Sequence, residues 1–179
     1  MKTVQVLDKK FQRTISNEEI QIAISKMAKK INTDLKNEDV IFLGILNGAF
    51  LFAADLFRQI DFNAQISFLK VASYQGTSSG GNVKRLIGIN EDIADKTVVI
   101  IEDIIDSGVT IDYLLRQLKG YEPKKIIIAT FLFKPEAFVR DFKIDYIGME
   151  IPNDFIVGYG LDYYGYGRNL KDIYTLVKE

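Results

Sequence analysis

Short apolar runs that alternate with amphipathic helical segments are the feature that most limits how this chain can fold. The runs at residues 39–48, 96–101 and 124–133 are apolar over most of their length. Strands of this kind are typical of parallel sheets, which are buried on both faces. Their crossover connections are usually helices. We therefore predict an α/β fold, a mostly parallel central sheet with helices on both faces.

Three segments have the apolar spacing of helices. Ser16 and Glu19 precede the first segment at the spacing of a capping box. Gly120, followed by a proline three residues later, ends the third. The expected helices cover about residues 16–37, 49–60 and 108–120, and further strands are expected at 64–74, 83–90 and 146–152.

Two missing residue types restrict the chemistry. The chain contains neither cysteine nor histidine, which excludes a Ser-His-Asp triad, a thiolate nucleophile, a disulfide and a His/Cys zinc site. Catalysis would have to use carboxylates, lysine, arginine, tyrosine, hydroxyls and backbone groups. Any bound metal should be one that prefers oxygen ligands, such as Mg²⁺.

Charge and hydropathy restrict the partners. The formal net charge of −1 argues against nucleic acid as a partner, because domains that bind nucleic acid are usually basic. No apolar run approaches the ~20 residues that a membrane span needs. The N-terminal residues carry charges throughout and lack the apolar core of a signal peptide. We expect a cytoplasmic protein of one domain without internal repeats, acting on small molecules and not on a membrane.

An unusual group of acids follows the central apolar run. Glu102, Asp103 and Asp106 lie within five positions, just after a strand predicted to end at Ile101. At ~6 Å and an effective dielectric constant of ~20, each pair of these charges would repel by roughly 3 kcal/mol. A positive group is therefore expected nearby.

The residues after these acids have the composition of a phosphate-binding turn. "DSGVT", residues 106–110, leads into a predicted helix, and the first turn of a helix offers free N–H groups and the positive end of the helix dipole. In an open α/β sheet, ligands bind at this carboxyl edge of the strands. The alternative is that Ser107 only caps the helix and the acids form a solvated strand end.

One class of ligand satisfies both halves of the motif. A sugar phosphate would place its phosphate on the turn and its vicinal hydroxyls near Glu102 and Asp103, where Mg²⁺ would reduce the repulsion. A P-loop ATPase is excluded, because G-x-x-x-x-G-K-[ST] does not occur in the chain.

Residues 72–84, "ASYQGTSSGGNVK", join two predicted strands. Seven of these 13 residues are Gly, Ser or Thr. Loops of this length in a compact domain are often lids or binding loops. Composition alone leaves a mobile lid and a plain hairpin tip equally open.

The motif "VVIIEDIIDSGVT" resembles the phosphoribosyl pyrophosphate site of the type I phosphoribosyltransferases. The segments "GILNGAF", "ASYQGTSSGG", "FLFKPE" and "IPNDFIVGYGLDYYGYGRNL" are similar to the 6-oxopurine branch, the hypoxanthine-guanine phosphoribosyltransferases. The resemblance implies that residues 1–179 form one phosphoribosyltransferase domain. Its core would be at about 37–150, a small hood would come from about 1–15 and 151–179, and a mobile loop would lie at about 72–84.

The implied function is purine salvage. Phosphoribosyl would pass from 5-phosphoribosyl 1-pyrophosphate to N9 of hypoxanthine or guanine, giving IMP or GMP and pyrophosphate. The alternatives are a regulatory protein that senses phosphoribosyl pyrophosphate and binds nucleic acid or a partner, and a phosphoribosyltransferase for another base such as xanthine. The resemblance also implies a homodimer or homotetramer.

The resemblance assigns the acidic motif to phosphate, ribose and catalysis. Glu102 and Asp103 would bind the ribose hydroxyls, directly or through metal-bound water. Asp106 would lie near N7 of the purine as the catalytic general base or acid. The phosphate-binding residues would be Asp106, Ser107, Gly108, Val109 and Thr110.

The base site is implied by two later segments. Lys134 would donate to the purine O6, and Phe155 would stack on the ring. The backbone carbonyls of Ile156 and Asp162 would face the 2-position.

The remaining implied residues surround the pyrophosphate. The backbone of Leu46, Asn47 and Gly48 would bind it, with an unusual peptide geometry between the first two, and Arg168 would pair with its oxygens. Ser73 and Tyr74 would begin the mobile loop. Mg²⁺ would be held by Glu102, Asp103 and Asp162.

The chain departs from the family pattern in two places. Asn47 stands where many relatives carry a basic residue, and Ala137 and Phe138 stand where basic residues often follow the Lys-Pro-Glu sequence. These changes bear on how tightly phosphoribosyl pyrophosphate binds.

Overall fold

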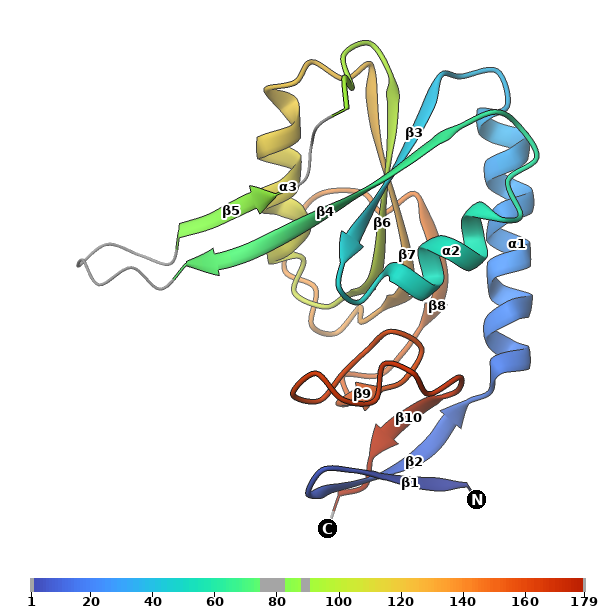
Figure 1. Ribbon diagram of the computed structural model, residues 1–179, viewed down its shortest axis with the longest axis vertical. Coiled ribbons are helices and arrows are strands. Elements are labelled where there is room, and N and C mark those ends of the chain that lie inside the picture. Colours follow the sequence, from blue (N-terminus) through green and yellow to red (C-terminus); the bar gives the residue numbers. More distant parts are fainter. Residues whose placement is uncertain (1, 75–82, 88–90, 179) are drawn as a thin grey trace.

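The computed structural model describes residues 2–74, 83–87 and 91–178, and side chains are described except within 72–90. Two separate sheets organise the molecule (Figure 1). The larger sheet has the strand order β5-β4-β3-β6-β7-β8. All neighbours in it are parallel except β5, which runs antiparallel to β4. Its strands are β3 (Val40–Leu46), β4 (Gln65–Tyr74), β5 (Val83–Ile87), β6 (Thr97–Ile105), β7 (Lys125–Phe133) and β8 (Tyr146–Glu150).

Helices cover both faces of this sheet, as the apolar strands predict. Helices α1 (Asn17–Leu35) and α2 (Phe50–Phe57) lie on one face and α3 (Val109–Lys119) on the other (Figure 1). Alternate residues of β3 point to opposite faces: Val40 and Phe42 pack with α1 and α2, whereas Ile41 and Leu43 pack with α3. The predicted α/β class is confirmed.

The smaller sheet joins the two ends of the chain. Its antiparallel order is β1-β2-β10-β9, and it lies below the larger sheet in Figure 1. The strands are β1 (Thr3–Val6), β2 (Lys9–Ile15), β9 (Ile156–Val157) and β10 (Ile173–Leu176). Phe11 and Tyr174 are fully buried in its own apolar cluster. The boundaries proposed for a core and a hood remain a prediction.

The capping box predicted at the start of α1 is present. The Ser16 hydroxyl accepts from Glu19 N–H at 3.3 Å, and the Glu19 carboxylate accepts from Ser16 N–H at 2.8 Å. Some predicted boundaries are wrong by a few residues: α1 ends at Leu35 and α2 at Phe57.

The prediction that the central strand ends at Ile101 is also wrong. Strand β6 continues to Ile105, because it pairs with β7 as far as Ile105 opposite Phe133. Glu102 and Asp103 are therefore strand residues. Their backbone is fixed by the sheet, which explains how two adjacent acids can be held in a buried position.

Two further predictions concern membrane-spanning helices and the mobile loop. No helix in the described part of the chain is long and apolar enough to cross a membrane. The middle of the predicted mobile loop, residues 75–82, lies outside the described residues. Ser73 and Tyr74 are described only as the backbone at the end of β4.

A buried carboxylate connects the smaller sheet to α1. Asp172, 1% exposed, accepts hydrogen bonds from Asn17 N–H at 2.9 Å and the Tyr174 hydroxyl at 3.3 Å. Lys2 and Arg13 lie 3.5 and 3.9 Å from its carboxylate. Burial raises the pKa of Asp172, but these hydrogen bonds and the two positive charges outweigh it, and the net effect lowers the pKa.

Replacing Asp172 with Asn should destabilise the fold by about 1–3 kcal/mol at pH 7, because a charged hydrogen-bond acceptor is lost. The lowered pKa means that this stabilisation is present above the unfolded-state pKa of about 3.9 and is lost as the pH falls through the folded-state pKa. Thermal unfolding from pH 7 to pH 3 should therefore show the variant and wild type converging at the acid end. The exposed Asp141→Asn is the control, and a constant gap at all pH values would contradict the prediction.

Candidate functional site

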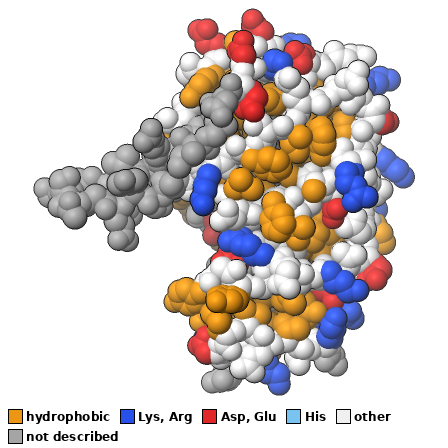
Figure 2. Space-filling model, in the orientation of Figure 1, with side chains coloured by type: hydrophobic (Ala, Val, Ile, Leu, Met, Phe, Trp, Pro, Cys, Tyr) orange, Lys and Arg blue, Asp and Glu red, His pale blue; other side chains and the backbone are white. Residues whose placement is uncertain are grey.

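The carboxyl ends of β3, β6 and β7 bring the predicted site segments to one edge of the larger sheet. The three strands are in parallel register, with Gly44 opposite Ile101 and Ile105 opposite Phe133. The segments that follow them therefore emerge together: residues 46–48, 106–110 and 134. The smaller sheet lies beyond this edge (Figure 1). In Figure 2, basic side chains lie at the boundary between the two parts, beside apolar side chains of the smaller sheet.

The predicted phosphate turn has the required backbone shape. Gly108 is in the left-handed region (φ 79°) directly before α3, so the N–H groups of the first helical turn are free of helical partners. Asp106 is exposed, and its carboxylate accepts from the N–H and hydroxyl of Ser107. A cavity of about 30 Å³ lies here, lined by residues that include Glu102, Asp106 and Thr110.

The segment after β7 packs against this turn, which sequence reasoning missed. A side-chain carbon added at Gly108 would lie 2.7 Å from the Phe138 ring and 3.0 Å from Arg140 Cγ. Phe138 also contacts the rings of Phe133 and Phe142 edge-on, at 5.3 and 5.2 Å between centroids. Phe138 therefore packs as an apolar residue, while the guanidinium of Arg140 lies 3.7 Å from the Asp112 carboxylate in the first turn of α3.

Glu102 and Asp103 are buried, each 8% exposed. Burial, followed by the negative charge of Asp103, raises the pKa of Glu102 well above its usual value. Burial also raises the pKa of Asp103, and the charge of Arg168 opposes that rise. Glu102 Oε2 has no hydrogen-bond partner among the described residues. Arg168 is thus one positive group near the acids, but an oxygen remains that a cation or hydroxyl could contact.

Three backbone segments meet tightly beside Asp103. A side-chain carbon at Gly48 would lie 1.8 Å from Asp103 Oδ2, and one at Gly160 would lie 2.1 Å from the Gly48 carbonyl oxygen. The peptide bond between Leu46 and Asn47 is cis, the unusual geometry expected there. Only glycine fits at positions 48 and 160, and the exposed Asn47 leaves the adjacent backbone open to a ligand.

Arg168 and Asp162 form one hydrogen-bonded unit next to these glycines. The Arg168 guanidinium lies 2.5 Å from Asp162 Oδ1 and donates to the Gly160 carbonyl at 2.6 Å. The other Asp162 oxygen accepts from Gly165 N–H at 2.6 Å. Within the described residues, no group of three or more acidic side chains could hold a metal by itself. A metal here would need ligand oxygens in addition.

The predicted base-binding residues also lie together. Lys134 Nζ donates to the Asp154 carbonyl at 2.7 Å, directly before Phe155. Phe155 is 47% exposed, unusual for a phenylalanine. Its ring lies 6.2 Å from Phe11 and 5.8 Å from Tyr163, between centroids. One face of an aromatic ring is therefore accessible next to a lysine ammonium, and Ile156 follows as the first residue of β9.

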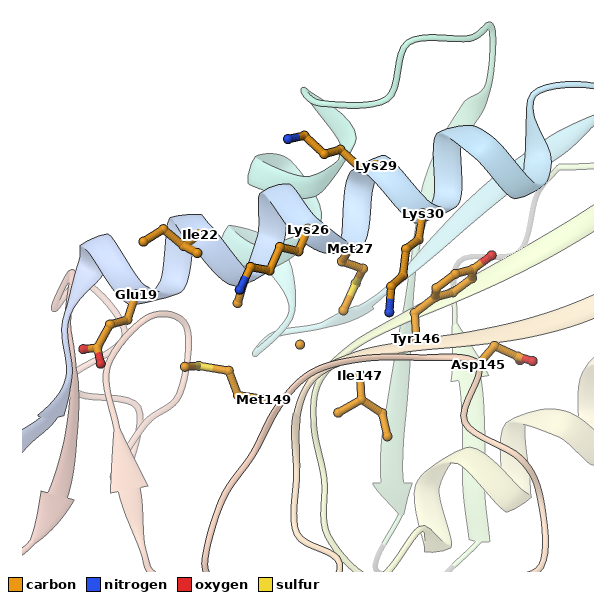
Figure 3. A pocket seen from close by; sticks show the side chains of 12 residues that line it. Glu19, Ile22, Lys26, Met27, Lys29, Lys30, Asp145, Tyr146, Ile147 and Met149 are labelled. Carbon is orange, nitrogen blue, oxygen red and sulfur yellow. The ribbon is translucent and has the colours of Figure 1, made fainter.

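A much larger cavity lies elsewhere. The groove between α1 and β8, about 570 Å³, is lined by residues that include Ile22, Lys26, Tyr146 and Met149 (Figure 3). It contains none of the predicted site residues. We place the site at the strand ends because perturbed carboxylates, a helix N-terminus and glycine-dependent contacts converge there, whereas volume alone specifies no chemistry.

Comparisons with known proteins identify a family that the chain resembles over most of its length. Residues 14–164 match the model of the phosphoribosyl transferase domain family. The chain is 39% identical over 169 residues to a hypoxanthine-guanine phosphoribosyltransferase of Mycobacterium tuberculosis, covering 90% of this chain and 84% of the relative. It is 37% identical to the Aquifex aeolicus protein of the same name, over 96% and 98% of the two chains. A solved hypoxanthine phosphoribosyltransferase from Staphylococcus aureus superposes with a TM-score of 0.85 at 33% identity, covering 93% and 91% of the chains.

Replacing Gly48 with Ala should destabilise the protein by about 1–3 kcal/mol, because the added carbon overlaps the Asp103 carboxylate. The matched control is Gly120→Ala, whose added carbon would approach nothing closer than 3.5 Å at an ordinary helical φ. Thermal unfolding of the two variants measures the difference. Equal stabilities would show that the backbone at residue 48 has more space than the structure indicates.

Proposed function

The chain belongs to the phosphoribosyltransferase family, and from this premise we propose that it transfers phosphoribosyl from 5-phosphoribosyl 1-pyrophosphate to N9 of hypoxanthine or guanine. The products are IMP or GMP and pyrophosphate, which makes the reaction a step of purine salvage. The observation that carries the proposal is the phosphate turn before α3, placed beside two buried carboxylates of β6. A single sugar phosphate can contact the turn with its phosphate and the two carboxylates with its hydroxyls.

The 5′-phosphate is bound by the turn at residues 106–110. Backbone N–H groups at the start of α3 and the hydroxyls of Ser107 and Thr110 donate to its oxygens, and the helix dipole favours its charge. Arg140, whose aliphatic stem lies beside Gly108, is paired with Asp112 in the first turn of α3, so its charge is partly neutralised there.

The ribose hydroxyls donate to the carboxylates of Glu102 and Asp103. The unpartnered Glu102 Oε2 and the all-oxygen donor set fit Mg²⁺, with Asp162 as a further contact through water. When bound, the metal neutralises charge on the pyrophosphate and between these acids. The side chains of Glu102 and Asp103 contribute by keeping the sugar in one orientation.

The purine stacks on the exposed face of Phe155, and Lys134 donates to O6. The carbonyls of Ile156 and Asp162 face the 2-position. An adenine amino group cannot accept from Lys134, so the site should reject 6-aminopurines strongly.

Transfer breaks the bond between C1 and the pyrophosphate oxygen and forms the bond from N9 to C1. Asp106 takes the proton that the purine loses. The Gly48 backbone and Arg168 hold the leaving pyrophosphate. Ser73 and Tyr74, predicted to begin a mobile loop, lie at the end of β4, and a role of that loop in excluding water stays a prediction.

In the alternative function, a regulatory protein would have the phosphoribosyltransferase fold without catalysing the transfer. It gives no reason for Asp106, Lys134 and Phe155 to converge at one edge, and the net charge of −1 does not favour nucleic acid. A preference for xanthine would require a different contact at the 2-position. The cytoplasmic location and the homodimer or homotetramer remain predictions from the sequence.

Wild-type protein with Mg²⁺ and phosphoribosyl pyrophosphate should convert hypoxanthine and guanine to nucleotides, and adenine at a rate lower by about 10⁴-fold or more. Lys134→Met should lose most of its kcat/KM with 6-oxopurines, because the O6 donor is gone. Chromatographic detection of the nucleotides measures both. Omitting Mg²⁺ is the control for the metal, and an absence of turnover with every 6-oxopurine would refute the proposed enzyme.

Asp106→Asn should lower kcat by about 10²–10⁴-fold, the range for loss of a general acid or base, with a smaller change in KM. Thr110→Val, which removes only a phosphate-binding hydroxyl, should instead raise KM for phosphoribosyl pyrophosphate. Steady-state kinetics with both substrates varied separates the two effects. If Asp106→Asn changed only KM, the residue would have a binding role alone.

A further inference from the structure

A part-buried tyrosine–aspartate hydrogen bond connects α2 to the "GYG" segment of residues 158–160. The Tyr159 hydroxyl donates to Asp55 Oδ2 at 2.8 Å. Tyr159 is 4% exposed and its backbone is in the left-handed region (φ 48°), a conformation that a tyrosine adopts only when its surroundings hold it there. The Gln21 amide of α1 donates to the same carboxylate oxygen at 2.9 Å.

The residue after Tyr159 is the one that packs against the pyrophosphate loop. Gly160 lies so close to Gly48 that an added side-chain carbon would be 2.1 Å from the Gly48 carbonyl oxygen. The Gly160 carbonyl accepts from Arg168 at 2.6 Å, and Gly160 N–H donates to the Arg168 carbonyl at 3.0 Å. A shift of the Tyr159 backbone would therefore move both groups assigned to the pyrophosphate.

Asp55 lies on α2, the helix that directly follows the pyrophosphate loop. Strand β3, the loop and α2 are continuous in sequence, so the loop is held at one end by the sheet and at the other by this helix. The hydrogen bond from Tyr159 joins α2 to the segment that carries Gly160 and Arg168. The loop and the arginine are thereby fixed to each other through side chains that do not contact the substrate.

We propose that the Asp55–Tyr159 pair is a positioning element for pyrophosphate binding, which sets the distance between the Gly48 backbone and Arg168. The inference rests on the proposed function, since it deepens the role of that site. Burial and the hydrogen bond to Asp55 raise the pKa of Tyr159, so its hydroxyl stays protonated as a donor over the working pH range.

The chain contains a matched control. The Tyr146 hydroxyl donates to Asp34 Oδ2 at the same 2.8 Å, and Tyr146 is 9% exposed. This pair joins β8 to α1 beside the groove of Figure 3, away from every site residue. A loss of stability common to part-buried tyrosine–aspartate pairs should appear in both variants, whereas an effect on the substrate should appear only in one.

The experiment compares Tyr159→Phe with Tyr146→Phe in the full chain. Tyr159→Phe should raise KM for phosphoribosyl pyrophosphate, and Kd for Mg²⁺-pyrophosphate in calorimetry, by about three- to tenfold, a modest loss of positioning. Its KM for hypoxanthine should stay within twofold of wild type. Tyr146→Phe should leave all three constants unchanged while lowering Tm by a similar amount.

Two results would overturn the inference. One is an unchanged Kd for Mg²⁺-pyrophosphate in Tyr159→Phe, and the other is an equal rise of both KM values, which would indicate a general structural defect. If Tyr159→Phe does not fold, Asp55→Ala, which removes the acceptor of the Tyr159 hydroxyl, replaces it, with the same expected selectivity for pyrophosphate. Failure of the proposed function is distinguishable, because wild type itself would then show neither turnover nor binding of Mg²⁺-pyrophosphate.

Discussion

The burial of two adjacent carboxylates at the end of a central strand is the constraint on which the rest of the site depends. Glu102 and Asp103 could not remain there if the backbone were free to turn outward, and the pairing of β6 with β7 as far as Ile105 prevents this. Burial raises the pKa of both acids. The surroundings reduce the cost unequally: a hydrogen bond with Glu102, backbone hydrogen bonds and the charge of Arg168 all oppose the rise in the pKa of Asp103, while one oxygen of Glu102 is without a partner among the described residues. A ribose hydroxyl or a divalent cation in contact with Glu102 would offset the remaining cost of burying its charge.

Close backbone packing then determines where the other groups can lie. Glycine at position 48 lets the loop after β3 approach the Asp103 side chain, and glycine at position 160 lets the segment after β9 approach the Gly48 carbonyl. The cluster therefore joins three stretches that are far apart in sequence. The Gly160 carbonyl accepts from the Arg168 guanidinium, which is also paired with Asp162. The arrangement of side chains at this site thus depends on close contacts that leave no room for a β-carbon at either glycine.

The sequence predicted the larger sheet better than the smaller one for a physical reason. Apolar runs such as residues 124–133 are buried on both faces and have one plausible conformation, whereas β9 has two residues and β1 has four, too few to show a period. The phosphate turn was evident from local composition, because Gly108 and the helix that follows are adjacent in sequence. The contacts of Arg140 with Gly108, and of Gly160 with Gly48, join positions 32 and 112 residues apart. The spacing of apolar residues along the sequence does not indicate contacts between residues so far apart.

The position of Lys134 shows how the two sheets together could select a base. The lysine follows β7 of the larger sheet, yet its ammonium donates to the carbonyl of Asp154, in the segment that leads into the smaller sheet. An ammonium has three donors, so one of them can fix its orientation while the others would remain for a purine stacked on Phe155. A carbonyl at the 6-position would accept such a donor; an amino group would bring two sets of hydrogens together and leave those donors unpaired. Selectivity would then depend on the alignment of the sheets as well as on the lysine itself.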